Sequence, residues 1–125
     1  MINFLQIRQH LPAYHEDSSK WAYDYCANVN DRQYVREFIT KPIYAYYYCK
    51  EIKDRPEVYK NITSSSSAFC YCLYVADRPE VRKNITDSRW AYEYCTDIKD
   101  RPEVRKNITD SIIIRRYESW KESFD

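Results

Sequence analysis

The chain has 125 residues and a formal net charge of +1, from 20 basic and 19 acidic side chains. This length fits one domain, and the balance of charge disfavours both a dedicated nucleic-acid binder and an acidic mimic of DNA. The chain contains no glycine, which excludes Gly-rich phosphate loops and dinucleotide-binding fingerprints, because both need backbone without a Cβ beside phosphate.

Residues 1–18 precede any repetition and are predicted to form an N-terminal capping helix and a linker. The capping segment is amphipathic and ends at Pro12; its apolar residues are Ile2, Phe4, Leu5, Ile7 and Leu11. Polar residues interrupt this segment, so it does not have the pattern of a signal peptide, and no apolar run approaches membrane-spanning length. We therefore expect a cytoplasmic protein that does not contact membranes.

A 23-residue period begins at residue 19. The phrases AYDYC, AYYYC, AFCYC and AYEYC start 23 residues apart, at positions 22, 45, 68 and 91. The phrase DRPEVRKNIT starts at Asp77 and again at Asp100, and variants of it start at Asp31 and Asp54 with the same spacing. A period of this length is typical of stacked structural repeats. The period divides the chain into units 19–41, 42–64, 65–87 and 88–110, followed by a predicted C-terminal capping helix at 111–125.

The first half of each unit has the pattern of an amphipathic helix. In the fourth unit, the apolar positions occur at i, i+3, i+4 and i+7, which places them on one face of a helix. These residues are Ala91, Tyr94, Cys95 and Ile98. Ser88 is the predicted N-cap of this helix.

The second half of each unit is predicted to be another helix, of roughly ten residues where an isolated helix needs ~12–15 to be stable. In the fourth unit it starts at Asp100, which has capping-box spacing to Glu103, with Pro102 in the first turn. Val104 and Ile108 then lie at i and i+4 and face the core. Because neither helix is stable alone, we expect the stacked units to fold together. The sequence thus predicts an all-α fold, a right-handed α-solenoid of four 23-residue two-helix repeats with N- and C-terminal capping helices.

The phrase AYEYCTDIKDRPEVRKNITDS, at residues 91–111, resembles the short two-helix repeats of some bacterial effector and large-phage proteins of unknown function. Those repeats pair an A-x-x-Y-A/C helix with a D-x-E-V helix. More distantly, the unit is similar to HEAT-like and leucine-rich-variant repeats. The resemblance covers residues 19–110 and departs from the pattern in lacking glycine between the helices. It implies a curved α-solenoid that binds macromolecules, and it implies no chemistry.

One face of the first helix differs between the units. Its second, sixth, ninth and tenth positions lie on one side of a helix, away from the alanine and cysteine face. In the first and fourth units these positions are mostly polar, as at Asp24 and Glu93. In the two central units they include apolar and aromatic residues, and an exposed cluster of that kind marks an interaction site unless a neighbouring loop covers it. The candidate partner-binding residues are Ile43, Tyr47, Cys70, Leu73 and Tyr74.

Arginines recur in the second half of every unit, and two interpretations are open. They pair with neighbouring acidic residues, or they contact an anionic partner such as a nucleic-acid backbone. Acidic residues in the same helices, such as Glu80 and Glu103, favour pairing within the chain. The candidate anion-contact residues are Arg32, Arg36, Arg55, Arg78, Arg82, Arg101 and Arg105.

The reactive side chains do not form a recognisable catalytic or metal site. Equivalent cysteines of stacked helices are ~9–10 Å apart, beyond the ~7 Å Cα limit for a disulfide, so they are predicted to be buried free thiols. His10 and His15 lie before the repeats, in a different region from the thiols, which disfavours a nucleophile–base pair. We expect no enzymatic activity, no metal and no cofactor. The equivalent cysteines are Cys26, Cys49, Cys72 and Cys95.

The repeats are therefore expected to form a non-enzymatic protein-binding scaffold that acts as a stoichiometric inhibitor or an adaptor. The 14 tyrosines agree with a contact surface, since tyrosine is enriched where proteins meet. The resemblance to phage repeats implies one further expectation, the inhibition of a host defence enzyme. Two alternatives are binding of a nucleic-acid backbone through the Arg/Lys ladder, and a homodimer whose two-fold contact buries the same face on both copies.

Overall fold

The structure is a computed structural model that describes residues 14–124; residues 1–13 and 125, and with them the apolar part of the predicted N-terminal cap, lie outside the described residues. Between residues 14 and 124 every regular element is a helix, which confirms the all-α prediction. Within this range, no helix is both long enough and apolar enough to span a bilayer.

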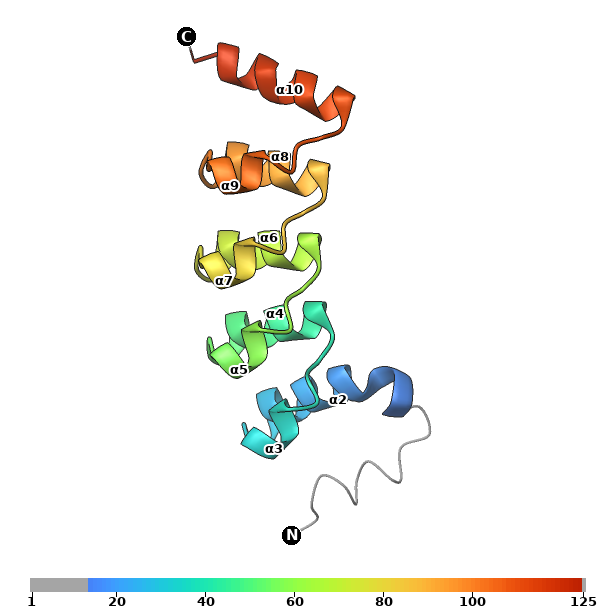
Figure 1. Cartoon of the computed structure of the whole chain (residues 1–125). Coiled ribbons are helices and arrows are strands. Elements are labelled where there is room, and N and C mark those ends of the chain that lie inside the picture. The colour runs from blue at the N-terminus through green and yellow to red at the C-terminus, as the bar shows by residue number, and fades with distance from the viewer. Residues whose placement is uncertain (1–13, 125) are drawn as a thin grey trace. The chain divides into compact units, whose positions relative to one another are not determined.

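Long helices of 10 to 15 residues alternate with short helices of 4 residues. The long helices are α2 (Tyr14–Asn28), α4 (Pro42–Glu51), α6 (Ser65–Tyr74), α8 (Ser88–Asp97) and α10 (Ser111–Glu122) (Figure 1). The short helices are α3 (Gln33–Arg36), α5 (Pro56–Tyr59), α7 (Pro79–Arg82) and α9 (Pro102–Arg105). From α4 onward the long helices begin 23 residues apart, as the sequence period predicts.

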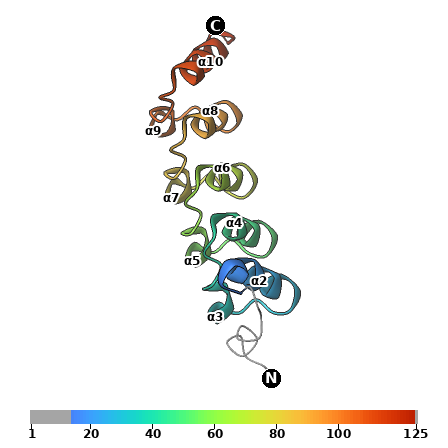
Figure 2. The ribbon, with the colours of Figure 1, turned by 90° about the vertical axis from the view of Figure 1, so that its right-hand side faces the viewer.

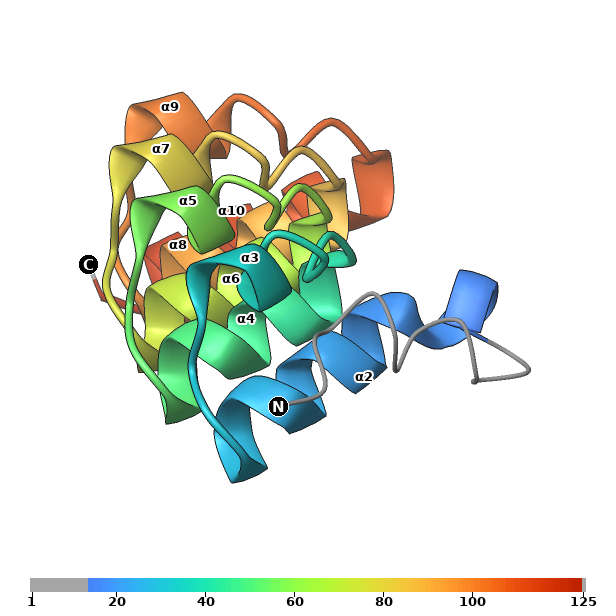
Figure 3. The ribbon, with the colours of Figure 1, turned by 90° about the horizontal axis from the view of Figure 1, so that it is seen from below.

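The helices belong to two compact units. The first ends at Ile62 and contains α2 to α5, and the second begins at Thr63 and contains α6 to α10. In the first unit α2 packs against α4, while α3 and α5 each pack against the long helix before them, on the same side of the pair (Figure 3). Alanine at the contact lets two helices approach closely, and the other core positions are filled by larger side chains. The apolar residues of this unit with 0% exposure are Ala22, Val35, Ile39, Ala45, Tyr48, Val58 and Ile62.

In the second unit, α8 packs against both α6 and α10. The short helices α7 and α9 pack against α6 and α8 and form a second row beside the long helices (Figure 2). The core has the same composition as in the first unit, because the same positions of the period face inward. Its apolar residues with 0% exposure are Ala68, Tyr71, Val81, Ile85, Ala91 and Tyr94.

The prediction of a second helix of about ten residues is wrong, because each short helix makes only one α-helical turn. In the fourth unit, the N–H of Asn107 bonds to the carbonyl of Val104 at 2.9 Å, and the N–H of Ile108 bonds to that of Arg105 at 2.9 Å. These i→i+3 bonds tighten the chain into a 3₁₀-type turn immediately after α9. Val104 and Ile108 still point to the core, with exposed fractions of 1% and 8%, so the apolar spacing indicated burial correctly and helix length incorrectly.

The predicted capping box at Asp100 is also wrong. The N-cap of α9 is Arg101, and no side chain caps the helix. The Asp100 carboxylate instead accepts hydrogen bonds from Arg105 at 2.9 Å and from the hydroxyl of Tyr117 at 2.7 Å. The hydrogen bond between the Asp100 carboxylate and the Arg105 guanidinium joins two charged groups and is stronger than the bond of a local helix cap. A cap is also less needed here, because Pro102 leaves the first turn of α9 with one N–H fewer to satisfy.

Ser88 is the first residue of α8 and not its N-cap. Asp87 caps the helix and accepts the N–H groups of Arg89 at 3.0 Å and Trp90 at 3.3 Å. The Ser88 hydroxyl serves the turn before α10, where it accepts the N–H groups of Thr109 at 2.9 Å and Asp110 at 3.0 Å. It also donates to the carbonyl of Asn107 at 3.1 Å. Ser19 and Ser65 make the same three bonds to the turns that follow α3 and α7.

Replacing Ser65 by alanine is expected to lower the free energy of unfolding by about 0.5–1.5 kcal/mol, because two backbone N–H groups and one carbonyl lose their shared partner and water replaces part of what is lost. Ser66→Ala is the matched control, since Ser66 is the next residue of the same helix and is exposed. Urea unfolding followed by circular dichroism measures both changes. Equal small effects from the two substitutions would contradict a stabilising role for the Ser65 hydroxyl.

Candidate functional site

A buried tyrosine hydroxyl joins two neighbouring helix pairs in the second unit. The Tyr94 hydroxyl donates to the Asp77 carboxylate, with 2.8 and 2.7 Å to its two oxygens. The Tyr94 oxygen accepts from Nε of Arg101 at 2.8 Å. Two ion pairs complete the network, from Arg82 to Asp77 at 3.1 Å and from Arg101 to Asp77 at 3.3 Å. Residues of α7, α8 and the start of α9 are thereby connected around one carboxylate.

The same network occurs in the first unit. The Tyr48 hydroxyl lies 2.9 and 2.8 Å from the two oxygens of Asp31 and accepts from Nε of Arg55 at 2.7 Å. Arg36 pairs with Asp31 at 3.0 Å. The repetition of tyrosine, aspartate and arginine in the sequence therefore has a structural explanation, because each set fixes one helix pair against the next.

These contacts place most of the predicted anion-contact arginines inside the fold. The side chains of Arg36 and Arg82 are only 11% exposed, and that of Arg101 is 27% exposed. Arg105 pairs with Asp100 at 2.9 Å, and Nε of Arg78 donates to the hydroxyl of Tyr71 at 2.7 Å. Their charges and donors are used within the chain.

Arg32 differs from the arginines at equivalent positions. Its Nε is buried and has no hydrogen-bond partner among the described residues. In the other repeats this atom donates to a tyrosine hydroxyl seven positions earlier, as in the pair Arg55 and Tyr48. The corresponding Tyr25 instead stacks against Trp21, with 5.3 Å between ring centroids.

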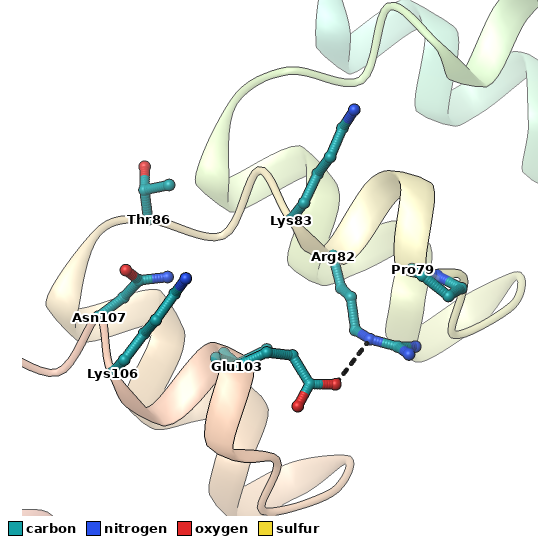
Figure 4. Close-up of a pocket in the computed structure, with 8 residues that line it drawn as sticks. Pro79, Arg82, Lys83, Thr86, Glu103, Lys106 and Asn107 are labelled. Atoms are coloured by element: carbon teal, nitrogen blue, oxygen red, sulfur yellow. Dashed lines mark ion pairs between the residues drawn. The ribbon is translucent and has the colours of Figure 1, made fainter.

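Shallow grooves run between successive short helices. In the second unit the groove between α7 and α9 encloses about 260 Å³, and an ion pair of 3.5 Å between Arg82 and Glu103 crosses it (Figure 4). Lys83 and Lys106 line the same groove. The equivalent groove of the first unit has Glu37 in the place of Lys83, so the run of cations is interrupted there.

The predicted partner-binding residues of the first unit lie on α4 and are accessible. Ile43 is 40% exposed and Tyr47 is 38% exposed. Sequence reasoning missed the two tyrosines beside Tyr47, which are Tyr23 of α2 and Tyr44 of α4. The ring centroids of these two lie 6.0 Å from that of Tyr47 and 6.3 Å from each other. The aromatic residues at the third and fifth positions of the first two repeats were the available signal for this cluster: Trp21, Tyr23, Tyr44 and Tyr46.

The predicted partner-binding residues of the second unit lie on α6. Leu73 is 38% exposed and Tyr74 is 62% exposed, whereas Cys70 is half-buried. The equivalent positions one period later, on α8, are Thr96 and Asp97. Leu73 and Tyr74 are therefore exposed on α6, whereas Cys70 is partly covered.

All five cysteines are free thiols, and those at the four equivalent positions are buried. Burial, with the nearby Asp77 charge, raises the pKa of Cys72 to about 12. Burial likewise raises the pKa of Cys95 to about 11. These thiols stay protonated near neutral pH and are poor nucleophiles. Within residues 14–124, no three His, Cys, Asp or Glu side chains come together in a way that suits a metal ion.

The buried network changes the pKa values of its members. Burial acts to raise the pKa of Asp77, but hydrogen bonds from Tyr94 and Arg82, with the charges of Arg82 and Arg101, lower it below its ordinary value of 3.8. Burial and the hydrogen bond to Asp77 raise the pKa of Tyr94 well above its ordinary value. The pKa of Asp31 is lowered in the same way.

These shifts predict a stability plateau bounded by about pH 5 and about pH 8. An aspartate whose pKa is lower in the folded state stabilises the fold above its unfolded pKa, and this contribution is lost as the pH falls through the folded value. A tyrosine or thiol whose pKa is raised stabilises the fold below its unfolded pKa, and this contribution is lost as the pH rises. Urea unfolding across the pH range measures both limbs. Asp77→Asn should flatten part of the acid limb, and an unchanged acid limb would contradict this assignment.

The chain matches no protein-family model, no curated protein and no solved structure at a significant level.

Proposed function

We propose that this chain is a non-enzymatic scaffold that binds another protein through the outward face of its long helices, as a stoichiometric inhibitor or an adaptor. The observation that carries the proposal is the exposure of Leu73 and Tyr74 on α6, which are 38% and 62% exposed. The same positions of α8 carry Thr96 and Asp97. The repeat therefore tolerates polar residues there, and apolar ones are not needed for folding.

Exposed apolar side chains favour binding to a partner, because binding removes their surface from water. Burying a leucine or an aromatic side chain contributes about 1.5–3 kcal/mol, and tyrosine is among the residues that most often dominate interface energies. The first unit supports the same interpretation, because Ile43 and Tyr47 are about as exposed as Leu73, at 40% and 38%. Tyr23 and Tyr44 extend that surface with further aromatic area.

The test compares two double variants at equivalent positions of the period. Leu73→Glu/Tyr74→Lys changes the apolar face of α6, and Thr96→Glu/Asp97→Lys introduces the same side chains on α8. Tagged wild-type protein and both variants are used to capture partners from lysate of the source cells, and mass spectrometry quantifies each captured protein. We expect a partner that the α8 variant retains and that the α6 variant loses by at least about tenfold. Equal capture by all three proteins would overturn the proposal.

Two measurements support this comparison. Thermal melts verify that both variants fold, because a destabilised protein would lose partners without any change in its surface. Light scattering at high concentration tests the homodimer alternative, which predicts a dimeric wild type and a monomeric α6 variant. The resemblance to phage repeats adds host defence enzymes to the partners that the capture should be compared with.

Nucleic-acid binding is less well supported as a function. Arginines such as Arg36, Arg82 and Arg101 pair with aspartates of the fold, and phosphate contacts require cations that are free to release counterions. Glu37 further lowers the positive charge of the short-helix groove in the first unit.

We also propose, from the sequence period and the resemblance, that the repeats form a right-handed α-solenoid of four 23-residue units. Support comes from hydrogen bonds that recur at the same spacing within each unit. Asn61 donates to the carbonyl of Ile39 at 3.1 Å in the first unit, and Asn107 donates to that of Ile85 at 2.9 Å in the second.

A further inference from the structure

We propose that the groove between α8 and α10 binds an acidic peptide segment that carries an apolar side chain. The inference rests on the proposed function, since it assumes a protein ligand, and it assigns that ligand a chemistry and a second contact surface. The two helices are neighbours in the second unit (Figure 1). The open groove between them has a volume of about 620 Å³, which is large enough for several side chains.

The groove combines apolar surface with positive charge. Tyr92 of α8 lies on one side, and Ile112 and Trp120 of α10 lie on the other. Ile112 is 62% exposed, so most of its side chain is accessible to a ligand. Arg115 and Arg116 are the charged residues that line the groove. On α10, positions 112, 115, 116, 119 and 120 form one helical stripe, separate from the face that contains buried Tyr117.

The two arginines differ in how their charges are used from the arginines in and beside the short helices of this unit. Arg82, Arg101 and Arg105 each form an ion pair with an aspartate. Arg115 and Arg116 form none with a carboxylate in the described part of the chain, and both are exposed. Glu93 of α8 lies near enough for its charge to interact with that of Arg116, but it does not form an ion pair with it. A carboxylate from outside thus meets two guanidinium groups whose hydrogen-bond donors are available.

The apolar part of the groove favours a peptide over single-stranded nucleic acid. Binding of unpaired bases relies on aromatic rings whose faces are free for stacking. The ring of Trp120 already packs against Tyr117 and Phe124, with centroid distances of 5.9 and 5.1 Å. Ile112 offers an aliphatic contact, which suits an aliphatic side chain better than a base. The formal net charge of +1 also provides little long-range attraction for a polyanion.

The N-terminal segment of this chain does not have the chemistry of the proposed ligand. Residues 1–13 contain Arg8 and no acidic side chain, so their charge has the same sign as that of the groove. The occupant is therefore assigned to another protein, with aspartate or glutamate residues beside a leucine-like anchor.

The test uses a short fluorescein-labelled peptide with two central leucines flanked by glutamates. A peptide with lysines in place of the glutamates is the charge control, and oligothymidylate is the nucleic-acid control. Fluorescence anisotropy at low salt measures binding to the full chain. NMR of the tryptophan indole N–H groups, assigned with Trp120→Phe, shows whether the groove is the site. We expect saturable binding of the acidic peptide that shifts the Trp120 signal.

Variants then test the charges individually. Arg115→Gln/Arg116→Gln should weaken binding of the acidic peptide by at least about tenfold, because both guanidinium partners are lost. Lys106→Gln/Lys121→Gln removes the same net charge at residues that do not line the groove and should leave binding within about twofold. Glu93→Gln should strengthen binding, since it removes a negative charge that interacts with Arg116.

Several results would overturn the inference: equal binding of the lysine peptide, equal losses from the two double variants, or tighter binding of oligothymidylate. The Leu73→Glu/Tyr74→Lys variant separates this inference from the proposed function, because Leu73 and Tyr74 do not line the groove. That variant should bind the acidic peptide as wild type does. A partner that is lost with the α6 variant, combined with no binding of the acidic peptide, would leave the proposed function intact and overturn only the groove.

Discussion

Replacement of Asp77 by alanine is expected to lower the free energy of unfolding by about 2–4 kcal/mol. Removing one member of a buried ion pair costs about 3–5 kcal/mol, because it leaves the partner charge buried and unpaired. The lower range applies here because the Asp77 side chain is 22% exposed and that of Arg101 is 27% exposed, so water compensates part of the loss. Arg82, Arg101 and the Tyr94 hydroxyl all lose their common acceptor. Urea unfolding followed by circular dichroism measures the change.

Two controls separate the network from general effects of substitution. Asp97→Ala removes a carboxylate from an exposed position of α8 and should change stability by less than about 0.5 kcal/mol. Tyr94→Phe and Tyr92→Phe each remove one hydroxyl from the same helix. Only the hydroxyl of Tyr94 joins the network, so only Tyr94→Phe should be costly, by about 1–3 kcal/mol. Equal effects of the two tyrosine substitutions would show that the network does not stabilise the fold.

The sequence predicted the spacing and the buried face of the long helices well, because both are recorded in a local pattern, although α2 begins at Tyr14, before the predicted first repeat. Ala91, Tyr94 and Cys95 occupy one helical face, and all three are buried. The short helices were predicted less well. Apolar residues four positions apart, such as Val104 and Ile108, face the same side in a full helix and also in one α-helical turn followed by a 3₁₀-type turn. Periodicity cannot distinguish these two conformations over so few residues.

The roles of Asp100 and Ser88 were wrongly predicted for a related reason. Capping rules consider partners within about four residues, whereas the hydroxyl that Asp100 binds belongs to Tyr117, in the next long helix. The Ser88 hydroxyl likewise serves a turn about one period away, at Thr109. The identity of tyrosine and arginine at fixed positions of every unit was the sequence signal for such long-range contacts. It indicates that these residues bind each other and not a varying partner.

For the candidate binding surfaces, the informative positions are those at which the repeats differ and not those at which they agree. Comparing equivalent positions of the repeat pointed to Leu73 on α6, which is 38% exposed, and its role in binding stays a prediction. It could not indicate the α8–α10 groove, because α10 departs from the repeat and Ile112, Arg115 and Arg116 have no recurring pattern to be compared with. The arginines of the ladder recur in every repeat, but recurring charged residues such as Arg82 form ion pairs within the fold.

Replacement of Ile85 by alanine is expected to lower the free energy of unfolding by about 2–5 kcal/mol, the usual cost of truncating a fully buried isoleucine and leaving a cavity. Ile85 is 0% exposed and lies in the turn after α7. Its carbonyl also accepts a hydrogen bond from Asn107 at 2.9 Å, so a shift of the turn toward the cavity would strain that bond. Ile112→Ala is the matched control, since Ile112 belongs to the same unit but is 62% exposed. Urea unfolding should show a large loss for Ile85→Ala and almost none for Ile112→Ala. Similar midpoints for the two variants would contradict the placement of Ile85 in the core, and with it the 3₁₀-type turn that directs this residue inward.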